Sequence, residues 1–125
     1  MLVFMARNAI QVHGMPSKKE HYDPLLPSES NSHWQPWLSR KLMLKDIHAV
    51  AVEMPHPYRP RYEVWKKEFE RFDIGPETIL VGHSCGGGFL LRWLSENKDV
   101  YVGEVILVAP WINPLNDETV DVADF

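Results

Sequence analysis

The stretch with the clearest chemical potential is Gly82-His83-Ser84-Cys85-Gly86, which lies between a β-branched apolar run and an amphipathic run. A serine between two glycines at this spacing can be a nucleophile held on a tight turn from a strand into a helix. Gly82 and Gly86 permit a turn in which larger side chains would collide. The pattern predicts Ser84 as nucleophile and places the backbone N–H of Cys85 where it can stabilise an oxyanion. The alternative is a glycine-rich turn that merely starts a helix.

A second motif, Val12-His13-Gly14-Met15, ends the first apolar run of the chain. A His-Gly pair there would place the backbone N–H of Met15 beside the serine as a second oxyanion donor. Alone, the pair is common and more typical of a turn that ends a strand. Combined with the serine motif, it indicates an oxyanion hole formed by Met15 and Cys85, with His13 and Gly14 setting the geometry of the loop.

The base of a catalytic triad is harder to find. A serine nucleophile needs a histidine base and an acid that orients the base, yet no histidine follows Ser84. His83 is adjacent, and neighbouring side chains on a tight turn are expected to point apart. We expect His48, at the start of a strand, to be structural. The loop histidines could approach the serine only in a rearranged site; they are His21, His33 and His56.

The acids downstream of the serine do not complete a triad. Asp99 precedes the last apolar run and is expected on the surface at a helix end, away from the serine. The others follow that run, at the end of the sheet where the serine is expected; they are Asp117, Asp121 and Asp124. An acid without a base cannot activate the serine. The histidine spacings match no metal-ligand signature, so we expect no zinc and no other cofactor.

Four apolar runs predict β-strands, and helical patterns separate them. The predicted strands are 8–14, 47–54, 78–83 and 104–111. The last two are almost continuous in Ile, Leu and Val, as in strands buried on both faces of a parallel sheet. The alternation predicts an α/β fold with three layers, α/β/α, around a parallel sheet of about four strands, in one domain over 1–125. Loops 15–33 and 55–60, expected to be irregular, follow carboxyl ends of strands, where such sheets bind ligands.

Aromatic residues mark the helices. One pattern runs through Trp34, Trp37, Leu38 and Leu42, a second through Tyr62, Trp65, Phe69 and Phe72, and a third through Phe89, Leu90, Trp93 and Leu94. The second helix should end at Gly75-Pro76 and the third near Asn97. Tryptophans at helical spacing are expected to pack against the sheet, namely Trp34, Trp37, Trp65 and Trp93. We expect Trp111 to face the ligand cleft and the Cys85 thiol to be buried as a small hydrophobe.

The fourth strand has no predicted neighbour on its outer side, because the tail after it is too short to supply another strand and helix. Natural domains avoid a long, hydrophobic, uncovered edge. A homo-oligomer in which a second copy covers 104–111 is therefore kept open.

Composition is that of an ordinary globular protein, with 45% hydrophobic and 24% charged residues in a chain of 125. The net charge of −4 and the lack of a long basic run indicate no nucleic-acid partner. One cysteine suits a reducing compartment. The N-terminal residues lack the basic start, continuous apolar core and cleavage site of a signal peptide, so we expect none, and no apolar run approaches the ~20 residues that span a bilayer. We expect a cytoplasmic protein without a membrane partner.

These motifs resemble those of the α/β-hydrolase superfamily, and within it the small serine hydrolases of the retinoblastoma-binding protein 9 and YdeN-like family. The resemblance runs from Asn8 to about Pro114 and rests on the segments VHGMP, HWQPWL, AVEMPHP, YEVWKKEFE, TILVGHSCGGGFLLRWL and VILVAPW. It implies a hydrolase sheet, Ser84 as nucleophile, the amides of Met15 and Cys85 as oxyanion hole, and esterase-like or amidase-like activity on a small molecule. In that fold the acid and base follow later strands, which are absent here.

Two functions are consistent with this pattern. The first is the N-terminal part of a serine hydrolase that, as this chain, is truncated and weakly active or inactive. The second is a non-catalytic binding or interaction protein that retains the hydrolase fold.

Overall fold

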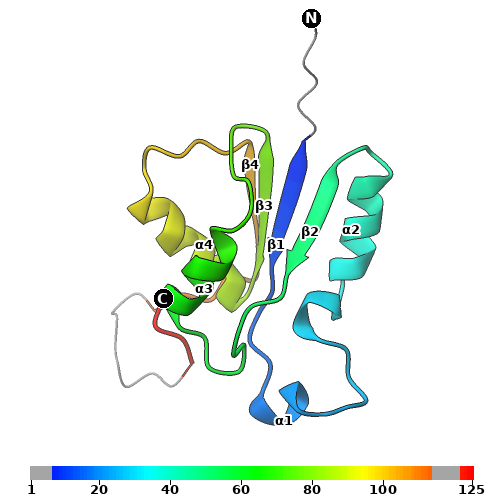
Figure 1. Ribbon diagram of the computed structural model, residues 1–125. Helices are drawn as coiled ribbons and strands as arrows, with labels where there is room; N and C mark the ends of the chain where they lie inside the picture. The colour runs from blue at the N-terminus through cyan, green and yellow to red at the C-terminus, as the bar shows by residue number, and fades with distance from the viewer. Residues whose placement is uncertain (1–6, 114–121) are drawn as a thin grey trace, which may run out of the picture.

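The computed structural model describes residues 7–113 and 122–125. It contains one parallel sheet of four strands, β1 (Asn8–Val12), β2 (His48–Val52), β3 (Thr78–His83) and β4 (Glu104–Val108), in the order β2-β1-β3-β4 (Figure 1). The four predicted strands are confirmed: β3 has the predicted bounds, β2 begins one residue later, and β1, β2 and β4 end two or three residues earlier than predicted. Val12 pairs with Gly82, so the two predicted motifs leave the sheet side by side.

Helices cover both faces of the sheet, which confirms the predicted three layers. They are α1 (Lys18–His21), the 3-10 helix η1 (Glu29–Asn31), α2 (Gln35–Met43), α3 (Tyr62–Phe69) and α4 (Cys85–Glu96). In Figure 1, α2 lies on one face beside β2, and α3 and α4 lie on the other. The prediction that 15–33 is irregular was incomplete, because α1 and η1 lie within it. No helix in the described part of the chain is long and apolar enough to cross a membrane.

Two hydrophobic cores flank the sheet because alternate residues of each strand face opposite sides. In β3, Leu80 joins the larger core under α3 and α4, while Ile79 and Val81 join the smaller core under α2. The predicted aromatic stripe supplies the larger core, with Tyr62, Trp65 and Phe69 fully buried; α3 then ends at Phe69, well before the predicted Gly75-Pro76. Phe72 packs on this core from the following turn.

The prediction that Trp37 packs against the sheet was wrong. Trp34, Leu38 and Leu42 pack against the smaller core, whereas Trp37 is 62% exposed. A spacing of four and four places the first three on one side of the helix, and Trp37 falls off that side. Lys41, one turn along, lies over its ring. Trp65 and Trp93 are buried as predicted.

The burial predicted for the fourth strand was also wrong. β3 is buried along almost its whole length, but most side chains of β4 are exposed. β4 is the end strand of the sheet, and none of its side chains belongs to either core. A continuous run of Val, Ile and Leu therefore does not distinguish a central strand from an uncovered edge strand.

The end of the chain contributes to the larger core, which sequence reasoning missed. Ala123 and Phe125 are buried, and the Phe125 ring lies 5.3 Å from Trp65 and 5.8 Å from Phe89. Figure 1 places this terminus beside α3. Residues 122–125 form neither a strand nor a helix, so their side-chain packing holds them against the core.

Candidate active site

Ser84 occupies a strained backbone position between β3 and α4. Its φ of 53° and ψ of −120° lie in a region that residues with a side chain rarely adopt, while none of the seven glycines has positive φ. The position is held on both sides: its N–H donates to the carbonyl of Val108 at 3.0 Å, and its carbonyl accepts from Gly87 and Trp111, each at 2.9 Å. Such strain persists where the surroundings over-determine it, and it concentrates at functional sites.

Gly82 and Gly86 are needed because a side chain at either position would clash with the backbone, whereas the strained backbone conformation belongs to Ser84. A Cβ on Gly82 would come 2.7 Å from the Cα of Gly87, and a Cβ on Gly86 would overlap the carbonyl oxygen of Val12. Both obstacles are backbone, which cannot move aside without displacing α4 or β1. Gly82 and Gly86 therefore let the first turn of α4 pack directly on the ends of β3 and β1.

The His-Gly loop lies against the serine, as the sequence predicts. A Cβ on Gly14 would come 3.2 Å from the Cβ of Ser84, so Met15 begins next to the serine side chain. No hydrogen bond between the described residues uses the backbone N–H of Met15 or of Cys85. The backbone N–H groups of Met15 and Cys85 thus flank the serine with no backbone or side-chain acceptor among the described residues.

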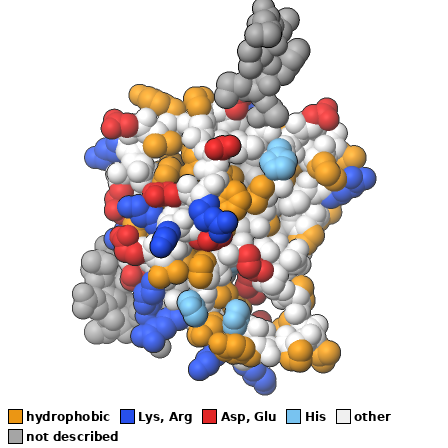
Figure 2. Space-filling view, in the orientation of Figure 1, with side chains coloured by type: hydrophobic (Ala, Val, Ile, Leu, Met, Phe, Trp, Pro, Cys, Tyr) orange, Lys and Arg blue, Asp and Glu red, His pale blue; other side chains and the backbone are white. Residues whose placement is uncertain are grey.

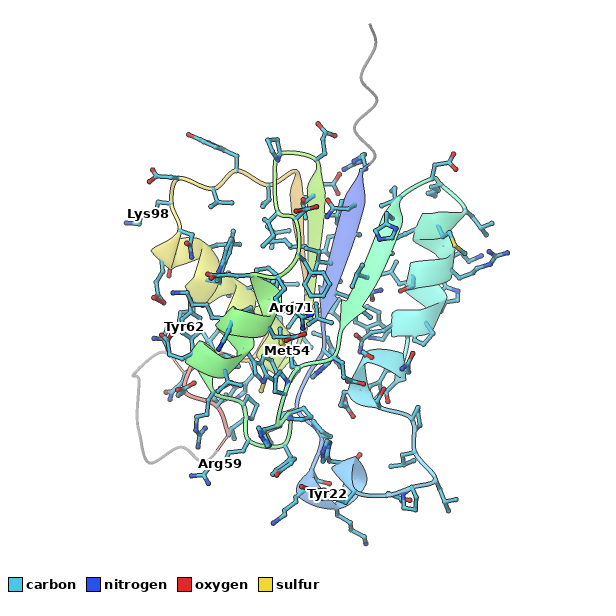
Figure 3. The ribbon with its side chains drawn as sticks, viewed as in Figure 1. Tyr22, Met54, Arg59, Tyr62, Arg71 and Lys98 are labelled. Carbon is cyan, nitrogen blue, oxygen red and sulfur yellow. The ribbon has the colours of Figure 1, made fainter. Side chains whose placement is uncertain are left out.

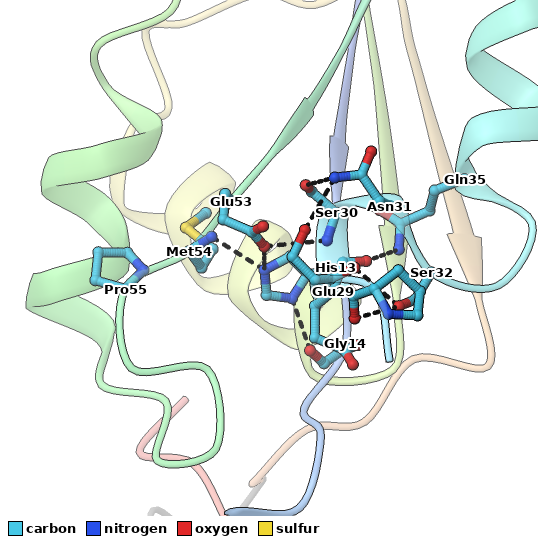
Figure 4. Close-up of polar contacts among 12 residues, drawn as sticks. His13, Gly14, Glu29, Ser30, Asn31, Ser32, Gln35, Glu53, Met54 and Pro55 are labelled. Carbon is cyan, nitrogen blue, oxygen red and sulfur yellow. Dashed lines mark hydrogen bonds and ion pairs between the residues drawn. The ribbon is translucent and has the colours of Figure 1, made fainter. Parts of the chain in front are cut away.

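His13 is fully buried and holds this loop to β2 and its exit (Figure 4). Its Nε2 accepts from the backbone N–H of Met54 at 3.0 Å, so its Nδ1 carries the proton and donates to the carbonyl of Gly14 at 2.7 Å. Burial lowers the pKa of His13 and keeps it neutral, although Glu53, 3.8 Å away, raises that pKa in part. With both nitrogens engaged, His13 cannot accept a proton from Ser84.

His83, within the serine motif, lies close to one other histidine, His33. The ring of His33 is 5.8 Å from that of His83, and Trp34 contacts His83 at 5.5 Å. His83 Nδ1 is buried with no hydrogen-bond partner among the described residues, and it approaches Gly14 on the side where Ser84 does. Burial, and then the neighbouring His33, lowers the pKa of His83. The contact of residues 33 and 34 with His83 joins segments that are far apart in sequence. The sequence indicated it only by placing His33 in a loop on the ligand side of the sheet.

The remaining histidines lie further from this group. Histidine side chains gather at the lower end in Figure 2, where the carboxyl ends of the strands point. There His21 and His56 pack with Tyr58, and the Tyr22 and Tyr58 hydroxyls are 3.2 Å apart. Tyr22 marks this end in Figure 3. These contacts join the two loops that follow β1 and β2. His48 is exposed at the opposite end, where β2 begins.

Of the acids downstream of Ser84, Asp124 has a structural role, Asp99 is on the surface, and the other two lie outside the described residues. The Asp124 carboxylate accepts from the backbone N–H of Tyr62 at 2.7 Å, which caps α3. Asp99 is exposed in the turn before β4, as expected. Asp117 and Asp121 lie outside the described residues. Within 7–113 and 122–125, Glu53 lies 3.8 Å from the buried His13 and Glu29 interacts electrostatically with His33, but no acid forms a hydrogen bond or ion pair with His33 or His83.

Neither a thiol nucleophile nor a metal is supported. Cys85 is buried as predicted, and burial raises the pKa of its thiol to about 11, partly opposed by Ser84. The thiol is thus protonated at neutral pH and a poor nucleophile. Among the described residues, no group of three or more His, Cys, Asp or Glu side chains could hold a metal ion. Trp111 is half-buried on the larger core, and its predicted place in the cleft stays a prediction.

A parallel sheet with helices on both faces, and a strained serine at a carboxyl end of a central strand, define a protein of the α/β-hydrolase type. The family model described as serine hydrolase matches residues 25–123, and the chain belongs to this family. It is 32% identical over 91 residues to "Putative hydrolase YdeN" of Bacillus subtilis (strain 168), covering 70% of this chain and 48% of that protein.

The solved structures give the same relationship. The crystal structure of the ydeN gene product from B. subtilis matches with a TM-score of 0.63 and 27% identity, over 81% of this chain and 50% of that one. The YdeN part of the predicted resemblance is confirmed, and the link to retinoblastoma-binding protein 9 stays a prediction. The chain spans about half the length of these relatives.

Proposed function

We propose that Ser84 is the nucleophile of a serine hydrolase, held on a nucleophile elbow between β3 and α4. Its Oγ would attack the carbonyl carbon of a small ester or amide, losing its proton and expelling an alcohol or amine. Water would then cleave the acyl-enzyme and restore the hydroxyl. The single observation that carries this proposal is the strained, doubly anchored backbone of Ser84 at the start of a helix.

The oxyanion hole would be the backbone N–H groups of Met15 and Cys85. Both are unused in the described part of the chain, and the approach of Gly14 to Ser84 brings their loops together. One such donor is worth about 2.7–4 kcal/mol in the transition state. His13 would act as a positioning residue, because its two hydrogen bonds fix the loop that carries the first donor.

Turnover by this chain would be weak, because no described histidine is both free and paired with an acid beside Ser84. His13 uses both nitrogens, and burial disfavours the protonated form that His83 would have to adopt as a base. Enzymes of this kind that lose triad members retain a residual acceleration of about 10³–10⁴ over water from binding and the oxyanion hole. We therefore place this chain in that residual range.

Hydrolysis of an activated aryl ester, 4-nitrophenyl acetate, tests the proposal. The native chain should release nitrophenol faster than Ser84→Ala, and the matched variant Ser95→Ala should behave as native because Ser95 is exposed on α4. Equal rates for the native chain and Ser84→Ala would contradict the assignment of Ser84.

A non-catalytic binding protein is the second candidate, and the engagement of His13 in structural hydrogen bonds favours it. Under that hypothesis Ser84→Ala loses no activity, but a slowly hydrolysed ester analogue still binds to the native chain. We also propose a cytoplasmic location, supported by a single cysteine that is buried and free of any disulfide; cell fractionation tests it.

A further inference from the structure

The side chain of Glu53, the first residue after β2, lies between two loops that approach the serine motif (Figure 4). Its Oε2 accepts from the backbone N–H of Ser30 in η1 at 3.1 Å. The same oxygen lies 3.8 Å from Nε2 of His13, whose loop continues to Met15. One carboxylate is therefore placed where it can fix one of these loops relative to the other.

Glu53 supplies a cap that η1 lacks within its own sequence. The first N–H groups of a helix have no acceptor inside the helix, and a side chain at the N-cap usually provides one. Ser28, at the N-cap of η1, makes no such bond. The carboxylate of Glu53 accepts from Ser30 instead, so the start of η1 is fastened to the exit of β2.

The backbone of Ser30 has no substitute for this acceptor. The residue is 8% exposed, and its N–H forms no other hydrogen bond among the described residues. A buried donor without an acceptor is costly, so loss of the carboxylate should displace η1 until the N–H reaches water or a new acceptor. The Glu53 side chain is itself half-exposed, so this displacement should be local and should leave the sheet intact.

The position of η1 determines where the following residues meet the serine motif. The carbonyl of Glu29 accepts from Nε2 of Gln35 at 3.0 Å, which ties η1 to α2. Between these two helices, the rings of His33 and Trp34 lie 5.8 Å and 5.5 Å from the ring of His83. A shift of η1 would therefore reach the residue that directly precedes the proposed nucleophile.

His13 leaves the carboxylate to η1 as long as its ring is neutral. Nε2 of His13 accepts from the N–H of Met54, so it has no proton to donate to Glu53. Burial lowers the pKa of His13 and maintains this neutral form, although Glu53 raises that pKa in part. The hydrogen bond to Ser30 is thus the bond that Glu53 makes near neutral pH.

We propose that Glu53 is a positioning residue for the reaction at Ser84, an inference that rests on the function proposed above. Its carboxylate fixes η1 through Ser30, and η1 in turn holds His33 and Trp34 against the serine motif. The action of Glu53 on Ser84 is indirect, and it requires an acceptor oxygen at position 53 rather than a negative charge. This requirement separates it from a carboxylate that acts through its field.

The rate of fluorophosphonate labelling of Ser84 tests this role, in variants shown by circular dichroism to be folded. Glu53→Ala removes the acceptor and should slow labelling about three- to tenfold, less than the ~10²-fold that a misplacement of about 1 Å can cost. Glu53→Gln keeps an acceptor oxygen and should label within about twofold of native. Glu63→Ala removes a carboxylate from an exposed position on α3 and should label as native.

Amide hydrogen exchange followed by NMR tests the contact without any reaction at Ser84. The Ser30 amide should exchange about tenfold faster in Glu53→Ala than in the native chain or Glu53→Gln, and the His83 ring resonances should shift. Native labelling or native Ser30 exchange in Glu53→Ala would overturn the proposal, as would equal slowing by Glu53→Gln. A native chain that never labels at Ser84 would contradict the proposed function; unchanged His83 resonances in Glu53→Ala would then overturn the positioning role as well.

Discussion

Gly14 lies so close to Ser84, 70 residues further along the chain, that a Cβ on Gly14 would come 3.2 Å from the Cβ of Ser84 and 3.4 Å from the carbonyl oxygen of His83. The parallel register of β1 with β3 produces this approach, since both strands end side by side. This close approach determines where the loop bearing Met15 begins. The geometry proposed for the oxyanion hole therefore depends on the absence of a side chain at position 14.

Gly14→Ala should slow any reaction of Ser84 by about tenfold, because an added methyl group must displace the serine or the loop by a few tenths of an ångström. The rate of covalent labelling of Ser84 measures this. Gly75→Ala is the matched control, since nothing lies within 4 Å of a Cβ there. A Gly14→Ala chain that is folded and reacts as fast as native would refute the stated role of this close approach.

Stability should fall as the pH drops below about 6.5, in part because of His13. Burial lowers the pKa of His13 in the folded chain below its ordinary value of 6.5. The unfolded chain then binds more protons below that pH, so the free energy of unfolding decreases as the pH falls toward the folded pKa. Urea titrations at a series of pH values measure this slope.

His13→Gln should make the slope of stability against pH shallower, while His48→Gln, at an exposed position, should not change it. Glu53 and His83 are the other titratable groups that influence His13, and both remain in each variant. Identical slopes for the native chain and His13→Gln would show that His13 is not the group held neutral.

Asp124 should stabilise α3 from a distant part of the chain. Arg61, at the N-cap position, makes no capping bond, and the Asp124 carboxylate instead accepts from the N–H of Tyr62. Asp124→Ala should cost about 1 kcal/mol of unfolding free energy, the usual value of an N-cap. Asp124→Asn keeps an acceptor and should lose less. Equal losses for the two variants would argue against capping.

Cys85 should resist alkylation in the folded chain. Its thiol is buried and burial raises its pKa to about 11, so little thiolate exists near neutral pH. Iodoacetamide should modify it only after urea is added, as mass spectrometry would record. Rapid modification of the folded chain would mean that the first turn of α4 opens readily.

Much of the fold could be predicted because local patterns carry it. The period of the apolar residues gave the four strands and the three longer helices, and the glycine spacing gave the turn at Ser84. The predictions of burial were wrong where burial depends on which other elements pack against a residue. Trp37 fits the helical spacing but does not lie on the side of α2 that packs against the sheet. β4 has the composition of a central strand but is the end strand of the described sheet.

In the candidate site, too, some features could be predicted from local motifs and others could not. The positions of Ser84, Gly14 and Met15 follow from motifs at the ends of adjacent strands. The hydrogen bond from Met54 to His13, the contact of His33 with His83 and the capping of α3 by Asp124 join residues 41 to 62 positions apart. No local pattern encodes such contacts, because they depend on how the loops pack after the sheet has formed.

Labelling with a fluorophosphonate, mapped by mass spectrometry, tests the central claim that Ser84 is a nucleophile. We expect one adduct on the peptide that contains Ser84, its loss in Ser84→Ala, and a rate far below that of a complete serine hydrolase. Absence of an adduct at Ser84, or an adduct that persists in Ser84→Ala, would contradict the assignment. Labelling as fast as in a complete hydrolase would instead contradict the claim that this chain lacks an effective base.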